Sequence, residues 1–169
     1  MFGSLEVEEF STQSLAFPQL LSPSTSQLLS MASIFTRIIN GEIPCYKLAE
    51  TEDYFSFLDI RPMAKGHALV IPKKEVDYIF DLDDDYLIGL HLFAKKVAKA
   101  LEATVPCKRI GIAVIGLEVP HAHIHLIPLN TLQDITFTKA VVEVSQEEMA
   151  SIAAAVAEKI VKSEKWNSS

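Results

Sequence analysis

The stretch His121-Ala122-His123-Ile124-His125-Leu126-Ile127-Pro128 carries three of the five histidines of this 169-residue chain, at alternate positions. If residues 120–127 form a strand, successive side chains point to opposite faces of the sheet. The three histidines would then share one face, while Ala122, Ile124 and Leu126 would pack into the core on the other. We therefore expect a row of imidazoles spaced about 6.6 Å apart along one side of a strand.

Three kinds of site could use such a row. A single zinc ion needs ligands that converge at about 2.1 Å, whereas the outer histidines lie about 13 Å apart, so at most two could share an ion. Structural histidines would need three separate hydrogen-bond partners. Catalysis fits best, because a neutral imidazole can attack phosphorus near pH 7 and crowded neighbours lower its pKa. Protonated neighbours would bind phosphate oxygens.

The rest of the sequence predicts an α+β domain with an antiparallel sheet of about five strands, since consecutive strands are set apart from the helices. Strands are expected, in chain order, at residues 45–49, 54–58, 67–71, 109–115 and 120–127, with a weaker candidate at 141–144. Helices are expected from Ser33 to Gly41, from the acidic run at 83–85 to about residue 101, and from the capping box of Ser145 and Glu148 onward.

Composition limits the classes of partner. The 15 Lys and Arg against 22 Asp and Glu give a net charge of −7, which argues against a nucleic-acid or anionic membrane surface. No apolar run reaches the roughly 20 residues that a membrane span needs. Cys45 and Cys107 lie far apart and form no Cys-x-x-Cys motif, and no basic residue precedes Arg37 as a signal peptide would require. We expect a reduced, cytoplasmic protein.

Residues 1–31 differ from the rest of the chain. They hold seven serines and no Lys or Arg, and no helical or alternating period persists in them. We expect a mobile Ser-rich N-terminal extension over residues 1–31, followed by one domain over residues 32–165.

The imidazole row matches the histidine-triad motif, His-φ-His-φ-His-φ-φ, in which φ is an apolar residue. Three further blocks match in the same order: residues 33–44 (Ser-Ile-Phe-Thr-Arg-Ile-Ile-Asn-Gly-Glu-Ile-Pro), residues 57–62 (Phe-Leu-Asp-Ile-Arg-Pro) and residues 66–73 (Gly-His-Ala-Leu-Val-Ile-Pro-Lys). The chain thus resembles the histidine triad (HIT) family over about residues 32–130. The resemblance implies a HIT-like fold with a long central helix, a C-terminal helix and a sheet that continues across a homodimer.

The resemblance also implies an activity, which is hydrolysis or nucleotidyl transfer at the α-phosphate of a nucleoside 5′-phosphate derivative. A phosphoramidate or a dinucleoside polyphosphate would react through a covalent nucleotidyl-histidine. His123 matches the family's nucleophile, His125 and His67 match residues that contact the phosphate, and His121 matches one that orients the nucleophile. Asp59 matches the acid that binds ribose hydroxyls. The residues that match the apolar cleft around the base, most often a purine, are Ile34, Phe35, Ile38, Ile43, Phe57, Leu58 and Ile60.

The chain departs from the family pattern beside the triad. Leu117 stands where many members have Gln, and Glu118 stands where some have Ser or Thr; both positions match residues near the phosphate or leaving group. A carboxylate there disfavours long polyphosphates. Ser33 and Thr36 stand where some relatives carry the paired cysteines of a structural zinc, so we expect no metal and no cofactor. Two alternatives remain: a nucleotide-binding regulatory module with little turnover, and a two-histidine metal site.

Overall fold

The computed structural model describes residues 32–138 and 141–167, and side chains up to residue 162. The Ser-rich extension expected over residues 1–31 lies outside the described residues, and its boundary stays a prediction. Among the described residues, no helix combines the length and the hydropathy that crossing a bilayer requires.

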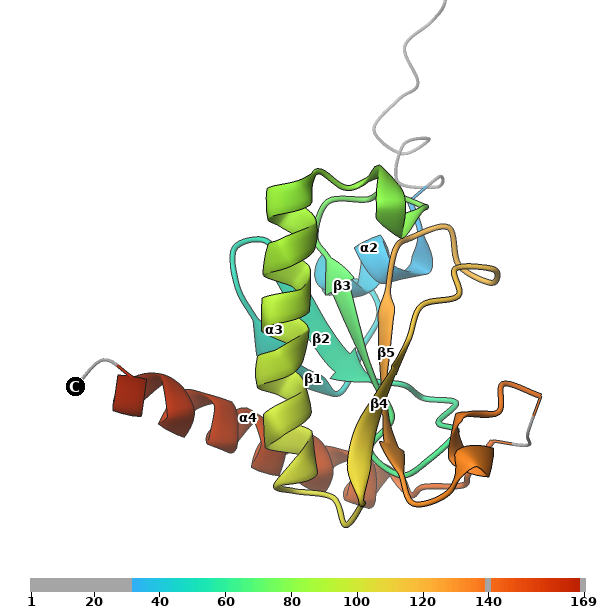
Figure 1. Ribbon diagram of the computed structural model, residues 1–169, viewed down its shortest axis with the longest axis vertical. Coiled ribbons are helices and arrows are strands. Elements are labelled where there is room, and N and C mark those ends of the chain that lie inside the picture. The colour runs from blue at the N-terminus through green and yellow to red at the C-terminus, as the bar shows by residue number, and fades with distance from the viewer. Residues whose placement is uncertain (1–31, 139–140, 168–169) are drawn as a thin grey trace, which may run out of the picture. The chain divides into compact units, whose positions relative to one another are not determined.

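The helices and strands follow the order that the sequence predicts (Figure 1). The elements are α2 (Ile34–Ile39), β1 (Lys47–Glu50), β2 (Tyr54–Leu58), β3 (Ala68–Pro72), the 3-10 helix η1 (Ile79–Asp81), α3 (Asp84–Glu102), β4 (Arg109–Ala113), β5 (Ile124–Leu129), the 3-10 helix η2 (Leu132–Ile135) and α4 (Gln146–Asn167).

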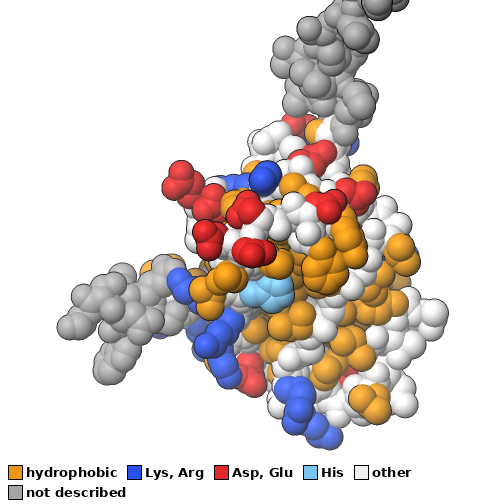
Figure 2. Space-filling model, turned by 45° about the horizontal axis from the view of Figure 1, so that its top comes forward, with side chains coloured by type: hydrophobic (Ala, Val, Ile, Leu, Met, Phe, Trp, Pro, Cys, Tyr) orange, Lys and Arg blue, Asp and Glu red, His pale blue; other side chains and the backbone are white. Residues whose placement is uncertain are grey.

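Polar side chains cap the helices where the sequence suggests. Ser33 accepts the backbone N–H of Thr36 at the start of α2, and Ser145 accepts that of Glu148 at the start of α4. Asp83 caps α3, and further exposed acidic side chains gather around this helix start, where the helix dipole favours them (Figure 2).

All strand pairs are antiparallel, and the strand order is β1-β2-β3-β5-β4. The α+β fold with a five-stranded antiparallel sheet, a central helix and a C-terminal helix is therefore confirmed. The prediction of a weak strand at residues 141–144 is wrong. The N–H of Val142 donates to the carbonyl of Pro62, so this segment binds a loop instead of a sheet strand.

The strand of the histidine row starts later than expected, at Ile124 instead of residue 120. The N–H of Ala122 donates to the carbonyl of Val76, in the loop after β3, at 2.6 Å. β4 ends at Ala113, which pairs with His125. The register between β3 and β5 likewise ends at Val70, opposite Ile124. Residues 121–123 therefore lie outside the ladder, and Ala122 is hydrogen-bonded to a loop instead.

The sheet separates two hydrophobic clusters, with α3 on one side of the strands and α2 on the other (Figure 1). The larger cluster, here called the α3-side core, also includes α4; its fully buried members include Leu58, Val70, Leu90, Val97, Leu101, Ile124, Leu126 and Val156. The smaller one, here called the α2-side cluster, consists of Phe35, Ile38, Phe55, Phe57, Leu69 and Ile71. Alternate residues of β2 and β3 belong to opposite clusters, as the two-residue period of a strand requires.

Candidate active site

Four imidazoles meet on the α2 side of the sheet. His67 comes directly before β3, His125 lies in the neighbouring β5, and His121 and His123 come directly before β5. The ring centroids of His67 and His125 lie 5.2 Å apart, and those of His123 and His125 lie 4.9 Å apart. The fifth histidine, His91, is exposed on α3, where its Nδ1 lies 3.0 Å from the carbonyl oxygen of Leu87.

The alternation expected for the row holds even though the strand starts late. Ala122, Ile124 and Leu126 all belong to the α3-side core. On the other side, the Phe35 ring makes T-shaped contacts with His121 and His123, with centroid distances of 5.7 and 5.2 Å. The histidine side of this segment therefore faces α2.

His123 has one ring nitrogen fixed and one free to react. Its Nδ1 lies 2.7 Å from the backbone oxygen of His121. A carbonyl oxygen only accepts hydrogen bonds, so Nδ1 carries the proton in the neutral ring. Nε2 is then unprotonated and has a lone pair for attack or coordination.

His121 is fully buried, and both its ring nitrogens are hydrogen-bonded. Nε2 donates to the carbonyl of Pro72 at 2.8 Å, and Nδ1 therefore accepts from the hydroxyl of Ser33 at 2.7 Å. Burial lowers the pKa of His121, so the ring is neutral near pH 7. The two hydrogen bonds of its ring fix the position of residue 121. They therefore also fix the His121 carbonyl, which binds His123.

His67 and His125 form a hydrogen-bonded pair of neutral rings. The N–H of Met63 donates to Nδ1 of His67 at 3.3 Å, so Nε2 of His67 donates to Nδ1 of His125 at 3.0 Å. This leaves the proton of His125 on Nε2. Burial, reinforced by the neighbouring His123, lowers the pKa of His67 and of His125 to about 4. The expectation of protonated neighbours is therefore corrected: at pH 7 both rings are neutral, and Nε2–H of His125 is the donor that remains.

A tight turn places His67 beside Asp59. Gly66 has a φ of +84°, and a Cβ there would lie 2.7 Å from Cγ2 of Val105, so the turn requires glycine. The N–H of Asp59 donates to the carbonyl of His67 at 2.9 Å. Oδ2 of Asp59 lies 3.5 Å from Nδ1 of His67, a contact that becomes an ion pair only when His67 is protonated.

Among the described residues, Asp59, His67 and His125 form a group that could hold a metal ion. Each offers one ligand atom, and these atoms lie within 4.8 Å of one another. Carboxylate oxygen and neutral imidazole nitrogen are ligands that zinc accepts. Only one histidine of the row, His125, belongs to this group, whereas the spacing along a strand allows two.

The residues expected around a base do not all lie together. Phe35, Ile38 and Phe57 are buried in the α2-side cluster, and Ile43 packs against it. Leu58 points the other way, into the α3-side core, because adjacent residues of β2 alternate. The sequence prediction for Leu58 therefore needs correction. Ile34 and Ile60 are 48% and 74% exposed.

The loop before the row carries the two departures from the family pattern. Gly116 turns it with a φ of +68°, Leu117 is 87% exposed, and Glu118 is exposed. Sequence reasoning missed the role of Ser33 as partner of His121 and the contact of Glu75 with α2. The contact between Glu75 and Ser33 spans 42 residues, and a single sequence gives no signal for it.

Comparison with known proteins agrees with this architecture. A family model described as the HIT domain matches residues 40–132. An adenosine 5′-monophosphoramidase of Saccharomyces cerevisiae is 40% identical over 115 residues, covering 68% of this chain and 71% of that protein. One of Schizosaccharomyces pombe is 42% identical over 100 residues, covering 58% and 74%.

Among solved structures, a HIT-like protein of Bartonella henselae matches with a TM-score of 0.65 and 28% identity, over 75% of this chain and 95% of that one. The sequence motif, the fold and these relatives agree, and the chain belongs to the histidine triad (HIT) family.

Proposed function

We propose that this protein hydrolyses nucleoside 5′-phosphoramidates, with an adenosine derivative as the preferred substrate, through a covalent nucleotidyl-histidine on His123. The observation that carries the proposal is the Nδ1–H bond of His123 to the His121 carbonyl, which leaves Nε2 unprotonated. The names of the two yeast relatives, both about 40% identical, support the class of substrate.

In the first step, Nε2 of His123 attacks the α-phosphorus, and the bond from phosphorus to the leaving nitrogen breaks. The positive charge that develops on the ring is stabilised by its Nδ1–H bond to the His121 carbonyl. Nε2–H of His125 donates a hydrogen bond to a phosphate oxygen, and the departing nitrogen takes a proton from solvent and leaves as an amine. Water then cleaves the phosphorus–nitrogen bond to His123, releasing the nucleoside monophosphate and restoring the imidazole.

The substrate's nucleoside would be held by the apolar side chains near α2 and by Asp59. The side chain of Asp59 is 21% exposed, and its Oδ1 accepts the N–H of Arg61 at 2.8 Å, which fixes the carboxylate. A fixed carboxylate can accept hydrogen bonds from two ribose hydroxyls. We include Glu118, which is exposed in the loop before the row and whose negative charge disfavours anionic leaving groups such as polyphosphates.

The deciding experiment compares turnover of several nucleotides by the wild type and by His123→Ala. The panel holds adenosine and guanosine phosphoramidates, the 2′-deoxy forms, dinucleoside polyphosphates and nucleotide sugars. We expect adenosine phosphoramidate to be turned over fastest, and kcat to fall by roughly 10⁴-fold in the variant. Mass spectrometry should find a nucleotidyl adduct on His123 in the wild type. Retained turnover in His123→Ala would exclude the proposal.

A nucleotide-binding module with little turnover is the alternative, and the exposed Leu117 favours it because no amide stands at that position. It predicts micromolar binding of a nucleoside monophosphate without hydrolysis of any member of the panel. The cluster of Asp59, His67 and His125 instead favours a metal site. Stoichiometric metal in protein purified without a His-tag would support that function.

We also propose a homodimer that continues the sheet through β4. β4 is an edge strand, and Ile112, Val114 and Ile115, in and directly after it, are 54%, 40% and 39% exposed. On α3, Ile88 and Leu92 are 57% and 58% exposed, and hydrophobic side chains are spread across the face shown in Figure 2. Sedimentation at micromolar concentration should give twice the chain mass; a monomer would contradict the proposal.

A further inference from the structure

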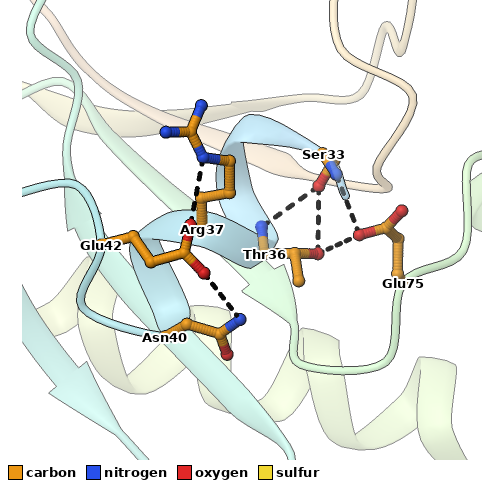
Figure 3. Close-up of polar contacts among 6 residues, drawn as sticks. All are labelled: Ser33, Thr36, Arg37, Asn40, Glu42 and Glu75. Carbon is orange, nitrogen blue, oxygen red and sulfur yellow. Dashed lines mark hydrogen bonds and ion pairs between the residues drawn. The ribbon is translucent and has the colours of Figure 1, made fainter. Parts of the chain in front are cut away.

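A series of hydrogen-bonded polar residues leads from Glu75 through Thr36 and Ser33 to His121. The proposed reaction assigns no role to Glu75 or Thr36. Oε2 of Glu75, in the loop after β3, accepts the N–H of Ser33 at 3.1 Å and the hydroxyl of Thr36 (Figure 3). Oγ of Ser33 accepts the N–H of Thr36 at 3.1 Å and donates to Nδ1 of His121. Ser33 is 7% exposed and His121 is fully buried.

The directions of the hydrogen bonds that link Glu75 to His123 follow from the groups that can only accept. The Glu75 carboxylate accepts a hydrogen bond from the Thr36 hydroxyl. The Pro72 carbonyl takes Nε2–H of His121, so Nδ1 of His121 must accept, and Ser33 is its donor. The His121 carbonyl in turn takes Nδ1–H of His123. In this arrangement Ser33 donates to His121 and Thr36 donates to Glu75, so neither hydroxyl donates across the 3.2 Å contact between Oγ of Ser33 and Oγ1 of Thr36.

Two hydroxyls compete for the same nitrogen of His121. Oγ of Ser33 lies 2.7 Å from Nδ1, and Oγ1 of Thr36 lies 3.5 Å from it. Thr36 does not donate to this nitrogen because its hydroxyl donates to Glu75. Partial burial raises the pKa of Glu75, but the hydrogen bonds from Thr36 and Ser33 outweigh it and hold the pKa below its usual value. The carboxylate is thus ionised at neutral pH and a strong acceptor.

We propose that Glu75 is a positioning residue. It accepts the hydrogen bond of the Thr36 hydroxyl and binds the N-terminus of α2, so that Ser33 is the only hydroxyl that donates to His121. Through the His121 carbonyl this fixes the place of His123, so the kinetic part of the proposal rests on the proposed function. α2 has six residues and is too short to be stable by itself, so its position depends on such anchors. Without Glu75, the Thr36 hydroxyl can donate to Oγ of Ser33 at 3.2 Å or to Nδ1 of His121 at 3.5 Å, and in the second case it competes with Ser33 and displaces the ring.

The chain offers a matched control on the same helix. Glu42 also anchors α2, accepting from Nε of Arg37 at 3.2 Å and from Nδ2 of Asn40 at 3.4 Å (Figure 3). These contacts lie at the other end of α2, and none of them leads to His121. Glu42→Ala removes the same charge as Glu75→Ala and also removes an anchor of the helix, but leaves the donor to His121 untouched.

The test combines imidazole ¹⁵N NMR of the free protein with steady-state kinetics. In Glu75→Ala we expect the His121 Nδ1 resonance to shift and kcat to fall about tenfold, with KM changed less than about twofold. Glu75→Gln keeps an acceptor oxygen and should restore both readouts to near wild-type values. Glu42→Ala should change neither readout.

The double variant Glu75→Ala/Thr36→Val separates this role from a general structural one. With no competing hydroxyl, Ser33 again donates alone, and kcat should return to within about threefold of the wild type. An unchanged His121 resonance in Glu75→Ala, an equal loss in Glu42→Ala, or a double variant no better than the single one would overturn the proposal. The NMR readout decides even if His123→Ala retains activity. If Glu75→Ala does not fold, Glu75→Gln decides, because a His121 resonance or a kcat that departs from the wild type in that variant would overturn the proposal.

Discussion

The two sides of the sheet are built from alternate residues of the same strands, yet they are held together in different ways. The α3-side core contains buried apolar side chains that need only be hydrophobic and of suitable volume. The α2 side carries the buried His67, His121 and His123, whose ring nitrogens need individual partners. An unpaired buried polar group costs about 1–3 kcal/mol, so each side chain on this side depends on particular neighbours. Stability therefore depends on apolar packing on the α3 side, whereas on the α2 side it also depends on particular hydrogen bonds, which hold the histidines in place.

Adjacent residues of one segment should therefore give opposite phenotypes, and this is the largest effect we expect. Ile124 is fully buried in the α3-side core, whereas His123 faces α2. Ile124→Ala should lower the free energy of unfolding by roughly 3–4 kcal/mol, because it removes buried atoms and leaves a cavity. Urea denaturation measures this, and kcat per folded molecule should stay within about threefold of the wild type.

His123→Ala serves as the reciprocal variant, with turnover lost and the unfolding free energy changed by much less. If Ile124→Ala abolished turnover without destabilising the protein, or His123→Ala unfolded it, the division of labour between the two sides would be wrong.

The comparison also explains which features the sequence could predict. The apolar period placed β2 at residues 54–58 and assigned Ala122, Ile124 and Leu126 to the core, because local alternation decides which side is buried. The start of β5 was missed, since the Ala122 N–H binds the carbonyl of Val76. No local pattern reports such a long-range bond.

The same limit applies to the candidate site. The alternation of the histidines predicts their common side, but the partners of His121 lie on α2 and on β3, up to 88 residues away. Leu58 was matched by resemblance to a block of residues, and its position within the two-residue period of β2 places it in the opposite core. Proximity between segments is decided by packing, which a single sequence does not display.

The second prediction concerns acid stability, which should be governed by the α2 side. The pKa of His67 is about 4 in the folded protein against 6.5 for an ordinary histidine. Between these values the unfolded chain binds a proton that the folded protein does not, so stability falls as the pH is lowered from 6.5 to 4. At 1.36 kcal/mol per pKa unit, His67 alone contributes a loss of about 3 kcal/mol. His125, also lowered to about 4, acts in the same direction.

Urea titrations at several pH values between 7.5 and 4.5 would measure this slope. His67→Gln should flatten it, while His91→Gln, which changes an exposed histidine of α3, should leave it as in the wild type. An acid slope as steep in His67→Gln as in the wild type would show that His67 does not contribute to it.

The smallest effect comes from two buried serines, one on each side of the sheet. Ser56 lies between Phe55 and Phe57 in β2, and alternation turns it toward α3; it is fully buried, and its hydroxyl has no hydrogen-bond partner among the described residues. Ser56→Ala removes an unpaired polar group, so the free energy of unfolding should stay unchanged or rise by up to about 1 kcal/mol.

Ser33 on the α2 side is the matched case, because its hydroxyl caps α2 and donates to His121. Ser33→Ala should lower the free energy of unfolding by about 1–2 kcal/mol. Urea denaturation of both variants gives the sign of each change. Equal losses in the two would mean that Ser56 has a partner of its own, and that buried polar groups matter on both sides of the sheet alike.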